Sequence, residues 1–180
     1  GHPHPDVSVP PPFPLGVATQ GGLSDCGLEG GCTMEELPQK RKQGLPAGIV
    51  IHDCYEGGLP CRALSFVRYD ISLEFDGNLA QAAGEAFQEL VSRDHFIVQK
   101  RSKKSKRGFT EVDLIPLIAR ATVEERRDTI ALDLVLRAQN PGLNPELVVA
   151  AIREHCPDAA PDFVIFHRRA VLDGQFQTWE

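Results

Sequence analysis

Residues 68–75 alternate strictly between apolar and polar side chains, the period-two pattern of a half-buried β-strand. A strand of this kind needs neighbouring strands to pair with and a hydrophobic layer against one of its faces. The side chains predicted to point inward are Tyr69, Ile71, Leu73 and Phe75. Those predicted to point outward are Arg68, Asp70, Ser72 and Glu74.

The segments that follow continue this pattern as an ordered series of helices and strands. Asn78, with Gln81 three residues later, has the spacing of a helix capping box, and apolar residues then recur at helical spacing up to residue 90. Short strands are predicted at residues 96–100 and 110–114, and a longer one at 129–137. The sequence Asn144-Pro145-Glu146 predicts a second helix start. A last strand is predicted at residues 163–168, with Phe163, Ile165 and His167 on one face.

The predicted order is therefore β-α-β-β-β-α-β. Leaving out one strand of the central hairpin gives β-α-β-β-α-β, the ferredoxin-like split βαβ arrangement, in which two helices cover one face of a mainly antiparallel sheet. We expect residues 63–180 to form an α+β domain of this class with one extra strand.

The first third of the chain is much less patterned. Six prolines lie among residues 1–16, which favours an extended loop over an inner strand or helix. Residues 23–29 and 48–55 could be short strands, with a helix between them. We expect residues 1–62 to form a Pro-rich loop followed by a partial strand-helix-strand unit, an incomplete smaller α/β unit.

Composition predicts a soluble protein. The net charge is −6, 24% of residues are charged, and no apolar run approaches the roughly 18–20 residues of a membrane span. The start of the chain lacks the basic region and apolar core of a secretory signal, so we expect a cytoplasmic protein with no membrane contact. The five cysteines are odd in number and irregularly spaced, which predicts reduced thiols.

The strongest local feature is a basic run at residues 100–107, which lies between two predicted strands. Clustered cations attract phosphate backbones because binding releases counterions, so the run predicts contact with nucleic acid. An acidic protein partner, or a solvated turn that protects a sheet edge, are the alternatives. Since only Phe96 and Phe109 flank the run, binding is expected to be mainly electrostatic and base stacking is not supported. The six cations are Lys100, Arg101, Lys103, Lys104, Lys106 and Arg107.

Other candidate residues carry weaker signals. Asp113 follows the basic run, and we interpret it as the partner in an ion pair in preference to a general acid. His2, His4 and four cysteines could ligate a metal, but the cysteine spacings C-x₅-C and C-x₆-C do not match the usual zinc pattern, so no metal is predicted. No nucleophile motif or phosphate-binding loop is present, and no cofactor is expected.

Several short motifs resemble one family. His2-Pro3-His4-Pro5, the Pro12–Val17 stretch Pro-Phe-Pro-Leu-Gly-Val, the basic run with Glu111-Val112-Asp113-Leu114, the helix start Leu143-Asn144-Pro145-Glu146-Leu147 and His167-Arg168-Arg169 together resemble a radical SAM-linked bacterial domain of unknown function. That domain occurs alone or fused to B12-binding radical SAM proteins. Family members carry further residues before the His-Pro motif and tend to have Lys where this chain has Asp6.

The resemblance implies a bacterial cytoplasmic protein that works with a radical SAM enzyme on RNA or the ribosome. Our leading hypothesis is an accessory RNA- or ribosome-associated binding module without catalysis of its own. A second is an RNA-modifying enzyme that uses Asp113 or the loop with His2 and His4. A third is a protein-interaction scaffold for the radical SAM partner.

Overall fold

The computed structural model describes residues 60–77, 79–101 and 108–178, together with residues 7–8, 17–19, 22, 25–26, 33, 36, 50–51, 54 and 56–57. Two α-helices, α2 (Ala80–Val91) and α3 (Pro145–His155), lie within it. The strands are β1 (Val7–Ser8), β2 (Val17–Thr19), β3 (Asp25–Cys26), β4 (Phe66–Glu74), β5 (Ile97–Arg101), β6 (Phe109–Asp113), β7 (Ile118–Glu125), β8 (Thr129–Arg137) and β9 (Phe163–Leu172). Short 3₁₀ turns precede β4, β7 and β9.

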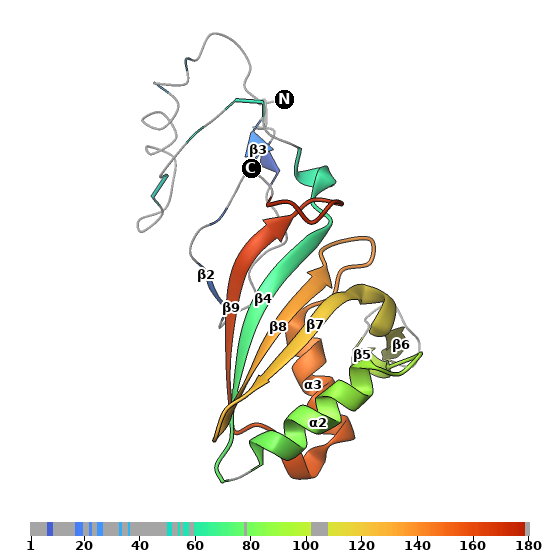
Figure 1. The fold of residues 1–180 in the computed structure, drawn as a ribbon. Coiled ribbons are helices and arrows are strands. Elements are labelled where there is room, and N and C mark those ends of the chain that lie inside the picture. Colours follow the sequence, from blue (N-terminus) through green and yellow to red (C-terminus); the bar gives the residue numbers. More distant parts are fainter. Residues whose placement is uncertain are drawn as a thin grey trace.

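One five-stranded sheet with the order β2-β9-β4-β8-β7 forms the body of the protein (Figure 1). The central strand β4 runs antiparallel to both β8 and β9, and β7 runs antiparallel to β8. Without β2, the strands and helices follow the chain as β4-α2-β7-β8-α3-β9, which is the ferredoxin-like split βαβ arrangement. The predicted α+β, ferredoxin-like class is confirmed.

The prediction that the central hairpin supplies a strand of the main sheet is wrong. Both strands of the central hairpin, β5 and β6, pair only with each other in the described part of the chain and lie outside the main sheet. The neighbour of β8 is instead β7, for which the sequence predicted nothing. This strand lies at a sheet edge and its register shifts between Ile118 and Arg120, so it buries no residue fully and lacks clean alternation.

A single hydrophobic layer lies between the sheet and the two helices. The residues predicted to point inward, Tyr69, Ile71 and Leu73 of β4 and Phe75 just after it, are buried there, as are alternate residues of β8. The helices contribute Ala83, Phe87 and Leu90 from α2 and Val148 and Ile152 from α3. On this face the buried residues of β8 are Ile130, Leu132, Leu134 and Leu136, and Val135 is buried on the opposite face. The opposite face of the sheet is not covered by a helix in the described structure, and we call it the open face (Figure 1).

The two helix starts differ in how they are capped. At α3 the Asn144 side chain accepts a hydrogen bond from the Glu146 amide at 3.0 Å, and Pro145 occupies the first turn, as the sequence predicted. At α2 the cap position is Leu79, which offers no side-chain acceptor. The predicted cap, Asn78, lies outside the described residues.

Part of the N-terminal segment joins the main sheet. Strand β2 pairs in parallel with β9, and β1 pairs antiparallel with β3, which lies within the predicted strand 23–29. Of the predicted strand 48–55, the described residues Val50, Ile51 and Cys54 are not in a strand. The remainder of the predicted 1–62 unit lies outside the described residues. No helix in the described part is long and apolar enough to cross a membrane.

Candidate functional site

The β5–β6 hairpin is anchored to the body at one end only. Phe96, just before β5, is 2% exposed, and Val98 and Leu114 are also buried. The Phe96 ring meets the ring of His155 at the end of α3 edge-on, with the ring centroids 5.1 Å apart. The Leu114 amide donates to the Phe96 carbonyl at 2.9 Å and closes the base. Beyond Val98 and Val112, every described residue of the hairpin is exposed, so this outer half leaves the body (Figure 1).

Two of the six predicted nucleic-acid contacts can be located. Lys100 and Arg101 are exposed at the outer end of β5, where they pair across the ribbon with Thr110 and Phe109. The other four, Lys103, Lys104, Lys106 and Arg107, lie outside the described residues, within the chain that connects Arg101 to Gly108. The hairpin therefore holds the start of the basic run at its outer end.

Asp113 lies at the base of the same hairpin. One carboxylate oxygen is 2.7 Å from Nδ1 of His95, and the other accepts hydrogen bonds from the amides of Phe96 at 3.0 Å and Ile115 at 3.2 Å. The His95 contact, followed by these amides, lowers the pKa of the Asp113 carboxyl. Arg101 lies four residues farther along the ribbon, or about 13 Å at 3.3 Å per residue. Among the described residues, Asp113 thus pairs with His95, a partner that no sequence pattern indicated.

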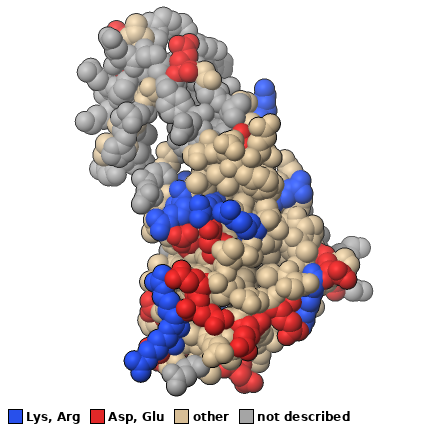
Figure 2. All heavy atoms as spheres, viewed as in Figure 1, with Lys and Arg blue, Asp and Glu red and all other residues tan. Residues whose placement is uncertain are grey.

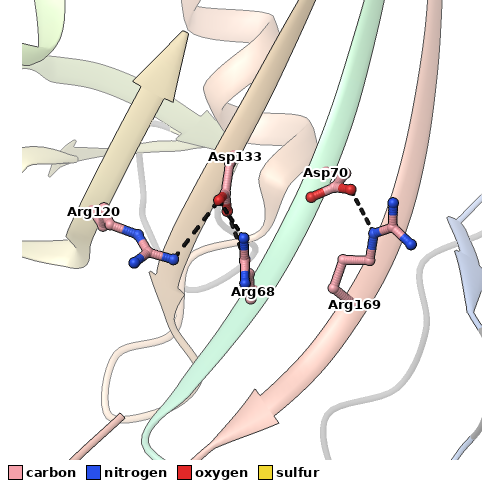
Figure 3. Close-up of polar contacts among 5 residues, drawn as sticks. All are labelled: Arg68, Asp70, Arg120, Asp133 and Arg169. Carbon is pink, nitrogen blue, oxygen red and sulfur yellow. Dashed lines mark hydrogen bonds and ion pairs between the residues drawn. The ribbon is translucent and has the colours of Figure 1, made fainter. Parts of the chain in front are cut away.

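A row of charged side chains crosses the open face of the sheet. Arg68 binds both oxygens of Asp133, at 2.9 Å from Nε and 2.6 Å from Nη2, and Arg120 approaches the same carboxylate at 3.7 Å (Figure 3). Arg169 pairs with Asp70 at 2.5 Å (Figure 3). Figure 2 shows adjacent cationic and anionic atoms on this face. Since each carboxylate already has an arginine partner, the row is nearly neutral and favours a structural role.

Exposed apolar side chains lie on the same face. Phe163 is 71% exposed and Ile165 is 53% exposed. They pair across β4 with Glu74 and Ser72, which places them on the open side. The predicted grouping of Phe163, Ile165 and His167 on one face of the strand agrees with this register, and that face is the open one. A shallow hollow next to them is lined by residues of β4, β7 and β8, among them Ser72 and Ala131.

Arg168 is the one charged residue buried among the described positions, at 5% exposure. It pairs across the sheet with Tyr69 of β4 and Thr19 of β2, on the face covered by the helices. Burial lowers the pKa of the Arg168 guanidinium and raises the pKa of the Tyr69 phenol. This residue falls in the His167-Arg168-Arg169 motif noted in the sequence.

The described residues contain no group of three or more His, Cys, Asp or Glu side chains that could hold a metal. Cys54, Cys61 and Cys156 are free thiols. His2 and His4, candidates for a functional loop, lie outside the described residues. The described chemistry is therefore a basic hairpin with an anchored base, and an open sheet face with paired charges and exposed apolar residues.

The comparisons with known proteins give one match. A family described as an uncharacterized protein conserved in bacteria (DUF2344) matches residues 2–145 of the 180. Comparison with curated proteins and with solved structures gave no match.

Proposed function

We propose a function from the premise that this chain belongs to the DUF2344 family of proteins conserved in bacteria: it is an accessory module that binds RNA or the ribosome through the β5–β6 hairpin and works with a radical SAM enzyme. The radical SAM partner and the association with the ribosome are proposed from the motif resemblance. A protein that acts on RNA or the ribosome is expected in the cytoplasm. The RNA contact is supported by the hairpin itself.

The observation that carries the proposal is where the positive charge lies. The chain has 19 cations and 25 anions, and six of the cations fall in residues 100–107. The rest of the chain thus has 19 − 6 = 13 cations against 25 anions, a net charge of −12. A polyanion is repelled by such a body and attracted to the run. Because Lys100 and Arg101 are exposed on the outer half of the hairpin, phosphates can reach the start of the run without meeting the acidic body.

The geometry around Asp113 favours binding over catalysis. Both of its oxygens already accept hydrogen bonds, and its lowered pKa keeps it charged at neutral pH. A general acid needs a pKa raised toward the working pH, which is the opposite shift. Asp113 also does not line the hollow on the open face. No described feature supports the alternative of an independent RNA-modifying enzyme.

The proposal is tested by the fluorescence anisotropy of a labelled 20-nucleotide RNA at low salt. Wild type should bind, and Lys103, Lys104 and Lys106 replaced together by Glu should bind at least tenfold more weakly. The matched control replaces Arg93, Arg126 and Arg127 by Glu. It makes the same change in net charge, at exposed positions just after α2 and in the β7–β8 turn, and should lose little affinity. No binding by wild type, or equal losses in both variants, would refute the proposal.

The exposed pair Phe163 and Ile165 favours a second candidate function, a scaffold that docks the radical SAM protein. Exposed apolar side chains on a sheet face that no described helix covers are typical of a protein interface. The test is co-purification with a radical SAM protein of the same bacterium after nuclease treatment. Replacing Phe163 and Ile165 by Ser should abolish it, whereas hairpin charge reversal should not. Loss of the complex on nuclease treatment would contradict this candidate.

A further inference from the structure

We infer that Phe109, together with Arg101 across the ribbon, is a stacking site for an unpaired nucleobase, so that the hairpin takes single-stranded RNA or a loop in preference to a duplex. This inference rests on the proposed function and adds the class of RNA and the residue that selects it.

The structure separates the two aromatic residues that flank the basic run. Phe96 is 2% exposed and belongs to the core, whereas Phe109 is 48% exposed. In the sequence these are the only two aromatic residues that flank the run, and for that reason base stacking was not supported there. Phe109 is thus the single described aromatic residue of the hairpin strands that a ligand can reach.

The register of the ribbon explains why Phe109 is exposed. Residues that pair across a two-stranded ribbon share a face, and Val98 pairs with Val112 on the face that packs on the body. Phe109 is three positions from Val112, so it lies on the opposite, outward face. There its direct partner is Arg101, and side chains so paired lie about 5 Å apart at Cβ.

An aromatic ring beside a guanidinium is suited to a nucleotide. The ring offers a face on which any base can stack, and the cation meets the adjoining phosphate. The remaining cations of the run follow Arg101 directly in the sequence. Glu111 lies on the same outward face, two residues from Phe109 toward the base of the ribbon, and its negative charge would repel phosphate. The RNA backbone is therefore expected to pass the Arg101 end of the ribbon and not its base.

This geometry selects against duplex RNA. Bases inside a duplex are already stacked on their neighbours, and the major groove of A-form RNA is too deep and narrow for a side chain to read. A base in a single strand or loop can leave its neighbours and stack on a protein ring. Duplex RNA would still meet the cations of the run, so it should bind, but without the contribution from Phe109.

The test compares Phe109→Leu with wild type on a 12-nucleotide single-stranded RNA and on a 12-base-pair duplex, by anisotropy over a range of salt concentrations. Phe109→Leu should lose about tenfold in affinity for the single strand, the size typical of one stacked base. Its duplex affinity and its salt dependence should not change, because its charge is unaltered. Phe109→Tyr should keep wild-type affinity, which excludes a general effect of mutation at this site.

The matched control is Phe163→Leu, the same substitution at an exposed ring on the open face, which should bind like wild type. Thermal melting checks that every variant is folded. If the hairpin cations are needed for binding but Phe109→Leu behaves like wild type, the stacking site is refuted and the proposed function stands. If wild type binds neither RNA, both fail.

Discussion

Removing the outer half of the hairpin should leave the domain folded, since that half buries nothing. In the variant considered, residues 100–110 are deleted and Gln99 is joined to Glu111 by Asn-Gly, a pair that favours the two-residue hairpin turn. Gln99 and Glu111 are paired in the native register, so they can close the shortened ribbon. The buried base, Phe96 with Val98, is left intact.

The expected change in the free energy of unfolding is the difference of two small terms. Two exposed cross-strand pairs are lost, Lys100 with Thr110 and Arg101 with Phe109, each stabilising by roughly 0.2–1 kcal/mol. Shortening the loop from residues 102–108 to two residues lowers the closure cost by about 1 kcal/mol. The terms oppose each other, so the net change should be within about 1 kcal/mol.

Urea unfolding followed by far-ultraviolet circular dichroism measures this change. Phe96→Ala is the contrasting variant. It removes a buried ring at the hairpin base and should cost about 3–5 kcal/mol. A loss above about 3 kcal/mol in the shortened variant, or a loss as large as that of Phe96→Ala, would show that the outer half contributes to the core and would refute the division of the hairpin into a buried base and a free end.

Three further predictions concern the body of the domain. Leu134→Ala, at a fully buried position of β8, should destabilise by about 2–5 kcal/mol in urea unfolding, and a loss below 1 kcal/mol would contradict the described core. Gly84→Ala in α2 should be neutral or stabilising by up to about 1 kcal/mol in thermal melting. The three atoms nearest to a new Cβ, at 2.5–3.0 Å, all belong to the side chain of Glu125, which is exposed and can rotate away; clear destabilisation would refute this. Asp113→Asn should destabilise at neutral pH, because the native pKa of Asp113 is lowered and its charged form stabilises the fold above the unfolded pKa. That stabilisation is lost as pH falls through the native pKa, so the two proteins should converge in acid, and a difference that grows in acid would reverse the sign of this reasoning.

The inner strands and the second helix could be predicted because their residues face a single layer. Strand β4 alternates cleanly since one side meets the core and the other meets solvent. At α3 the cap is local, so Asn144 and Pro145 indicate it by themselves. Strand β7 could not be predicted, because its inward residues are at most half-buried and the register shift between Ile118 and Arg120 breaks their period-two spacing. The parallel pairing of β2 with β9 joins distant segments through three residues, too few to leave a pattern.

For the candidate site, the sequence predicted which charged residues are present but not where they lie in the fold. The basic run is visible as a count of cations, but its separation from the sheet depends on Phe96 and Leu114 packing into the core. Strand β9 shows the limit most clearly, because apolar residues occupy both of its faces. Alternation alone does not tell that Phe163 is exposed while Arg168 is buried, since this depends on which face the helices cover.

The salt dependence of RNA binding tests the central claim most directly. If all six cations of residues 100–107 contact phosphate, the plot of log K against log salt for single-stranded RNA should have a slope of about −4, at roughly −0.7 per contact. With Lys103, Lys104 and Lys106 changed to Gln, the slope should fall to about −2. A slope near zero in wild type, or the same slope in both proteins, would contradict the assignment of the hairpin as the RNA-binding element.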